Sequence, residues 1–160
     1  MRHLKLLLLM LCLCPVARPQ DSSSGRPSDL KGLKKVYVDA GADLKSRRRI
    51  IKELNKPGLG LTLLDKPEGA EVILDFGGRT EDHVENLSLY VGYPQQFDTV
   101  QIHKQILIGR GRVFVVKDGK PRSVMSFEDM KNAGAFWERA PATNFGRNFR
   151  KLYKKANGIK

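Results

Sequence analysis

Histidines and acidic residues are the side chains of this sequence best suited to chemistry, but their spacing does not favour catalysis. His83 and His103 lie twenty residues apart, and no His-x-x-x-His or His-Glu-x-x-His pair occurs. Asp39 and Asp75 end two predicted strands, where acids commonly cap turns. A pocket that gathered these acids with one of the histidines would support a small hydrolase, which we keep as an alternative. The spacing predicts a protein that is not an enzyme and holds no metal or cofactor.

Serine and glycine motifs add little to the case for catalysis. Ser88 and Ser123 are candidate nucleophiles, but no Gly-x-Ser-x-Gly turn presents either of them. The Gly-Arg-Gly-Arg sequence at 109–112 lacks the third glycine and the following helix of a phosphate-binding loop. We interpret it as a bend between two strands. The same segment partly matches an RNA-binding motif, but Arg112 stands where base stacking requires an aromatic ring, so no specific nucleic-acid binding is expected.

Positive charge is the strongest compositional signal. The chain has 160 residues and a formal net charge of +12. Two groups of cations fall on predicted helices, and they would form one anion-binding patch if both helices covered the same sheet face. This patch would attract anionic lipid headgroups, acidic polysaccharide or nucleic acid; the alternative is a solvated helix surface. Its candidate residues are Arg47, Arg48, Arg49, Arg147, Arg150, Lys151, Lys154 and Lys155.

The first twenty residues have the pattern of a secretory signal peptide. Arg2 and Lys5 precede an apolar run at 6–14, and small residues follow at 16–17. As a helix this run is about 14 Å long, too short to span a hydrocarbon core of about 30 Å. Residues 1–20 therefore predict export to the periplasm or the medium and cleavage, after which the protein does not span a membrane. Both cysteines lie in this segment, so the mature chain can form no disulfide.

The remaining chain divides into a tether and one domain. Residues 21–33 are rich in serine, proline and glycine and predict a flexible tether. Residues 34–158 predict a single α+β domain, in which a mixed sheet of about five strands carries two main helices on one face.

Alternation and helical spacing place the elements of this domain. Strands are predicted at 35–40, 59–65, 71–76, 105–116 and 121–126, and helices at 43–54 and 142–156. Asp118-Gly119 predicts a tight hairpin turn. Residues 77–100 are interpreted as an irregular excursion with at most one extra strand, and Ser126 as the cap of a short helix that carries Met130. Trp137 is expected in the core or between helices.

The first half of the domain resembles a group of exported bacterial envelope domains that includes the amino-terminal domain of TolB and the curli-secretion protein CsgG. The resemblance covers 35–76 well, through Val-Tyr-Val-Asp at 36–39, Ile-Ile-Lys-Glu-Leu at 50–54, and the step from Leu-Leu-Asp at 63–65 into the third strand. It covers 105–127 loosely. It implies an envelope-associated binding or scaffolding role and transfers no catalytic residue. The expected partner is an unknown protein or an anionic envelope component.

Overall fold

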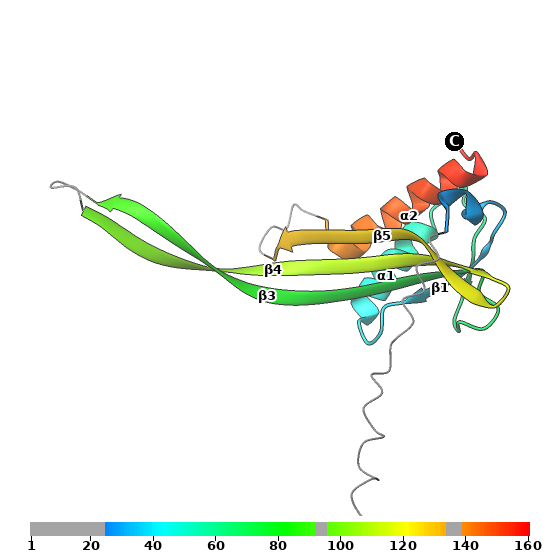
Figure 1. Ribbon diagram of the computed structural model, residues 1–160, viewed down its shortest axis with the longest axis horizontal. Helices are drawn as coiled ribbons and strands as arrows, with labels where there is room; N and C mark the ends of the chain where they lie inside the picture. Colours follow the sequence, from blue (N-terminus) through cyan, green and yellow to red (C-terminus); the bar gives the residue numbers. More distant parts are fainter. Residues whose placement is uncertain (1–24, 92–95, 134–138) are drawn as a thin grey trace, which may run out of the picture.

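The computed structural model describes residues 25–91, 96–133 and 139–160. The predicted signal peptide at 1–20 and Trp137 lie outside these residues, so the expectations for them stay predictions. Figure 1 shows a body in which two helices pack on a five-stranded sheet, and a long hairpin that projects from this body. Within the described ranges, no helix is both long and apolar enough to cross a membrane.

The strand β1 (Lys35–Asp39) has a neighbouring strand on each side, and apolar residues at alternate positions bury one of its faces. Val36 and Val38 are buried, whereas Tyr37 lies on the opposite face. β1 pairs in parallel with β2 (Thr62–Leu64) and with β3 (Val72–Val91).

Two antiparallel strands complete the sheet. β4 (Gln96–Lys117) pairs with β3, and β5 (Lys120–Asn132) pairs with β4. The turn between β4 and β5 uses Asp118 and Gly119, whose φ angles of 53° and 70° fit the predicted hairpin. The strand order is β2-β1-β3-β4-β5, which confirms the α+β class and the mixed five-stranded sheet.

The helix α1 (Leu44–Leu54) begins where its sequence supplies a cap. The Asp43 carboxylate accepts a hydrogen bond of 2.9 Å from the Ser46 backbone N–H. Hydrogen bonds from Ser46 hold the pKa of Asp43 below its usual value. Ile50 and Leu54 are buried on the side of the helix that faces the sheet.

The helix α2 (Pro141–Asn157) supplies the largest side chains of the core. It begins at a proline, and it ends at Gly158, which adopts a left-handed conformation with φ of 65°. Phe145 and Phe149 are fully buried. The hydroxyl of buried Tyr153 donates a hydrogen bond of 2.7 Å to the Leu33 carbonyl.

The two glycines of the Gly-Arg-Gly-Arg sequence seat α2 on the sheet. Gly109 and Gly111 lie inside β4, not at a bend, so the interpretation of 109–112 as a bend is wrong. A methyl group on Gly111 would lie 2.6 Å from the ring of Phe145, and one on Gly109 would overlap Pro141. Glycine is needed here because α2 packs directly against the strand.

The described part of 77–100, residues 77–91 and 96–100, is not irregular. They form the outer parts of β3 and β4, which stay in antiparallel register from Val72↔Val115 out to Val91↔Gln96. The polar residues that suggested irregular structure belong to a two-stranded ribbon. Such a ribbon has no helix on either face, so it needs no continuous apolar pattern.

The predicted helix around Met130 is also wrong. Residues 120–132 are the edge strand β5, and Met130 is 63% exposed. The backbone N–H and C=O groups of this segment form hydrogen bonds through the pairing of β5 with β4 over 106–117, instead of within a helix.

Part of the predicted tether is folded. Pro27–Leu30 form a 3₁₀ turn, η1, and Leu30 is fully buried in the core. The Gly25 N–H donates to the Ser123 carbonyl at 2.7 Å, and the Gly32 N–H donates to Asn157 at 2.8 Å. Residues 25–33 therefore pack on the domain, because Leu30 is buried in the core and Leu33 packs against it.

Candidate functional site

Packing of the domain core does not account for the outer part of the β3–β4 hairpin. β1 pairs with β3 only as far as Asp39↔Asp75, and β5 pairs with β4 only as far as Ile106↔Asn132. Within the described ranges, residues 82–91 and 96–105 therefore form a ribbon whose two strands pair with each other; at its base the Ala133 N–H also donates to the Gln105 carbonyl, at 2.7 Å. We call these residues the ribbon; it projects well beyond the helices (Figure 1).

The ribbon exposes large apolar side chains. Val84, Leu87 and Val100 are 47%, 43% and 41% exposed, and Leu87 is directly opposite Val100 in the register. On the same face Lys104 forms an ion pair with Glu85, and this cation lowers the pKa of the Glu85 carboxyl. An exposed two-stranded element with free edges on both sides can pair or pack with another protein.

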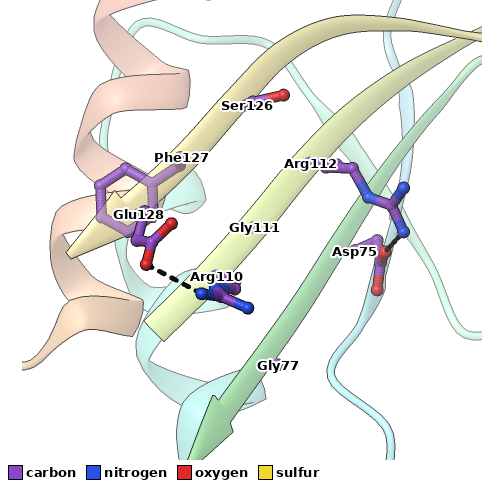
Figure 2. A pocket seen from close by; sticks show the side chains of 8 residues that line it. All are labelled: Asp75, Gly77, Arg110, Gly111, Arg112, Ser126, Phe127 and Glu128. Carbon is purple, nitrogen blue, oxygen red and sulfur yellow. Dashed lines mark hydrogen bonds and ion pairs between the residues drawn. The ribbon is translucent and has the colours of Figure 1, made fainter. Parts of the chain in front are cut away.

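The sheet face away from the helices carries a second candidate site, a shallow hollow of about 560 Å³. Figure 2 shows Arg112 next to Asp75, and Arg110 next to Glu128, on neighbouring strands around Gly77. The pairs are 3.3 Å and 3.1 Å long, and each side chain is more than 40% exposed. Exposed pairs of this kind contribute little to stability. Because each arginine already has a carboxylate, the hollow does not offer uncompensated positive charge.

The predicted anion-binding residues lie on two adjacent helices. Gly146 of α2 touches α1 so closely that a methyl group on it would lie 3.0 Å from Glu53. Arg150 is bound to the buried carboxylate of Glu53, at 3.5 Å, and Lys56 binds the same carboxylate at 2.7 Å. Arg150 therefore joins α2 to α1.

The other seven cations of the predicted patch differ in exposure. Arg48, Lys151 and Lys155 are exposed. The remaining four are half-buried: Arg47, Arg49, Arg147 and Lys154. The two groups thus lie on adjacent helices, and the single anion-binding patch stays a prediction.

The residues of the hydrolase alternative do not converge. Asp39 and Asp75 are neighbours in register, but Asp39 accepts a hydrogen bond from the Gly41 N–H and Asp75 binds Arg112. His83 and His103 lie on opposite faces of the ribbon, because His83 is opposite Lys104 and His103 is opposite Val84. The described residues contain no group of three or more histidines or acids that could hold a metal ion.

Glu71 has a structural role. One of its carboxylate oxygens accepts hydrogen bonds from the backbone N–H groups of Lys34 and Lys35, at 2.6 Å and 2.9 Å. These bonds hold the pKa of Glu71 below its usual value. The carboxylate ties the start of β1 to the start of β3.

The sequence analysis missed the ribbon as a candidate site, although a signal was present. Apolar residues recur at every second position at 87–91, and again at 100, 102, 106 and 108. This alternation is typical of strands with one apolar face. Gly77-Gly78, the polar residues that follow and Tyr93-Pro94 interrupt it, and they favour an irregular interpretation.

Comparison with known proteins assigns the chain to no family. No protein-family model and no curated protein matches the chain. A PDZ domain protein from Parabacteroides distasonis is similar in structure, with 12% identity and a TM-score of 0.40, over 76% of this chain and 31% of that one. A hypothetical protein from Chlamydia trachomatis matches with 11% identity and a TM-score of 0.40, over 78% of this chain and 96% of that one. The chain spans about a third of the length of the first of these proteins.

Proposed function

We propose that this chain is an exported, non-enzymatic domain that binds or scaffolds a protein partner at the cell envelope or outside the cell, and that the ribbon is its binding element. The observation that carries the proposal is the long β3–β4 hairpin, whose outer residues, 82–91 and 96–104, pair with no third strand in the part of the chain that the structure describes. The ribbon residues whose burial is described, 82–87 and 99–105, are not part of the hydrophobic core.

Three further observations support this proposal. The leader at 1–20 has the pattern of a secretory signal, and residues 35–76 resemble envelope domains with binding or scaffolding roles. The acids and histidines of the hydrolase alternative are separated, and the acids are engaged in a turn and an ion pair.

The experiment compares the full chain with a variant that lacks the ribbon. Glu81 and Ile106 are opposite each other in the register, so an Asn-Gly turn can join them directly in place of 82–105. Both proteins carry a photo-crosslinking residue at Arg79, and crosslinking is performed in cells. We expect adducts in the full chain and their loss in the shortened variant, with an unchanged circular dichroism spectrum. Identical adducts in both proteins would refute a role for the ribbon.

A second function, binding of an anionic polymer or lipid headgroup, is suggested by the eight cations that the adjacent helices α1 and α2 carry, of which Arg48, Lys151 and Lys155 are exposed. Retention on heparin tests it, with Lys151→Glu/Lys155→Glu as the variant because both side chains are exposed. Lys117→Glu/Lys120→Glu, beside the turn between β4 and β5, is the matched control of equal charge change, because both side chains are exposed and neither is on a helix. Elution of the wild type below about 150 mM salt, where the screening length is about 8 Å, would count against a specific anionic partner.

A further inference from the structure

The face of the sheet opposite the helices carries a row of apolar side chains. The register places one such side chain on each of β2, β1, β3 and β4, in neighbouring positions: Leu64, Tyr37, Ile73 and Phe114. All four are half-buried, and none belongs to the core beneath the helices. In Figure 1 both helices lie on the other face of the sheet. Among the described residues, no helix therefore covers this row.

The hollow of about 560 Å³ adjoins this row. Along β3 and β4, the pair of Ile73 and Phe114 is followed on the same face by Asp75 with Arg112, and then by Gly77 with Arg110. A Cβ atom built on Gly77 would meet no atom within 4 Å, so the space above this residue is open. From Phe114 to Arg110 the site extends for about 13 Å along β4. Its volume is in the range of about 300–1,000 Å³ that is typical of ligand sites.

The charged side chains of the hollow keep most of their hydrogen-bonding capacity. Arg112 donates one hydrogen bond to Asp75, at 3.3 Å, and Arg110 donates one to Glu128, at 3.1 Å (Figure 2). A guanidinium group has about five donor N–H bonds and a carboxylate about four acceptor positions. The guanidinium of Arg112 also lies 5.4 Å from the ring centroid of Phe114. Arg112 is thus held in place while most of its donors remain available, which lowers the entropic cost of binding a ligand.

We propose that the hollow and the apolar row together bind a neutral oligosaccharide. A sugar hydroxyl both donates and accepts a hydrogen bond, so it suits a site where guanidinium donors and carboxylate acceptors alternate. The two arginines and two acids sum to zero charge, which gives an anionic polymer no net attraction. A phosphate group would also meet the carboxylates of Asp75 and Glu128. The apolar C–H face of a sugar ring can pack on Tyr37 and its neighbours in the row.

Titration of the purified protein with cellohexaose, chitohexaose and maltohexaose tests the proposal. The titration is followed by the backbone amide resonances of ¹⁵N-labelled protein. We expect at least one of the three to bind with a dissociation constant of about 1 mM or below. The shifted resonances should belong to the strand segments around the hollow, at 75–77, 110–114 and 126–128.

Gly77→Val fills the hollow without changing any charge. A β-branched side chain fits a strand, and the backbone of Gly77 is not in the left-handed region. Gly78→Val is the matched control, because Gly78 is the next residue of β3 and its added Cβ would face the other side, 3.7 Å from the ring of Phe76. We expect Gly77→Val to weaken saccharide binding by about tenfold or more and Gly78→Val to leave it unchanged. Thermal unfolding of both variants checks that the fold is intact.

Three results would overturn the saccharide site. The first is the absence of any shift with all three hexasaccharides at about 10 mM. The second is equal weakening by Gly77→Val and Gly78→Val. The third is tighter binding of single-stranded oligothymidylate at this hollow than of any hexasaccharide, which would make a nucleic acid the ligand. None of these results affects the proposed function of the ribbon, because residues 82–105 do not line the hollow.

Discussion

Replacement of Gly111 by alanine tests how α2 is seated on the sheet. The new methyl group would lie 2.6, 2.7 and 2.9 Å from three ring atoms of Phe145. Carbon atoms pack at about 3.5–4.0 Å, so the ring must move by about 1 Å. Phe145 is fully buried between Phe76 and Phe127, with ring centroids at 5.5 Å and 5.4 Å, which leaves it no space to turn. The helix or the strand must shift instead.

The expected cost is that of overpacking a core, about 1–3 kcal/mol of the free energy of unfolding. For a domain of this size, this loss lowers the melting temperature by roughly 3–12 °C. Urea titration followed by far-ultraviolet circular dichroism measures the free energy directly. Replacement of glycine by alanine also reduces the conformational freedom of the unfolded chain. Where the site tolerates a side chain, this effect stabilises the folded protein by about 0.4–1 kcal/mol.

Gly77→Ala is the matched control, since it carries the same unfolded-state effect without the clash. Gly77 lies on β3 opposite Arg110, one pair from the Phe76↔Gly111 pair, and has no atom within 4 Å of an added methyl group. We expect Gly77→Ala to be neutral or slightly stabilising, so the two variants should differ by at least 1 kcal/mol. Equal stability of the two variants would refute the argument that Gly111 is required by close packing of α2.

Three further predictions follow from individual contacts. Glu71→Gln should destabilise by about 0.5–1 kcal/mol at pH 7, because a neutral amide accepts the two backbone hydrogen bonds less strongly. Folding lowers the pKa of Glu71, so its contribution to the free energy of unfolding is present above the ordinary value of 4.5 and is lost as the pH falls through the lowered value. In urea titrations at pH 7 and pH 3, the stability difference between Glu71→Gln and wild type should therefore be smaller at pH 3. A difference that stays constant would contradict this. Tyr153→Phe should cost about 1 kcal/mol through loss of the bond to the Leu33 carbonyl, measured by the same titration, and no loss would show that this bond does not hold residues 25–33 to α2. Replacement of 82–105 by Asn-Gly should change the melting temperature by less than about 4 °C, and a larger fall would mean that the ribbon supports the body.

Local patterns in the sequence predicted much of the body. Val36 and Val38 alternate with polar residues and form a strand with one buried side, as expected. Asp43 caps the helix that follows it, and Asp118-Gly119 forms the hairpin turn. In each case the signal lies within a few residues of the structure it specifies, because side-chain periodicity, capping and turn geometry are local interactions.

Sequence reasoning failed where a residue's role depends on a distant segment. Gly109 and Gly111 were interpreted as a bend because nothing nearby in the sequence shows that Phe145 and Pro141 will occupy the space above them. Ser126 was interpreted as a helix cap, although pairing of β5 with β4 made this segment a strand. Leu30 was assigned to a tether because its burial site is completed only by the folded domain.

The sequence by itself determined the class of fold, the positions of its two main helices and the basic character of its surface. Only the tertiary structure decided that β3 and β4 continue past their neighbours as a paired ribbon, in which Leu87 and Val100 share one face. Periodicity tells which residues of a strand share a face. Which side of the sheet that face lies on depends on the register through the preceding strand, and therefore on the whole assembled sheet.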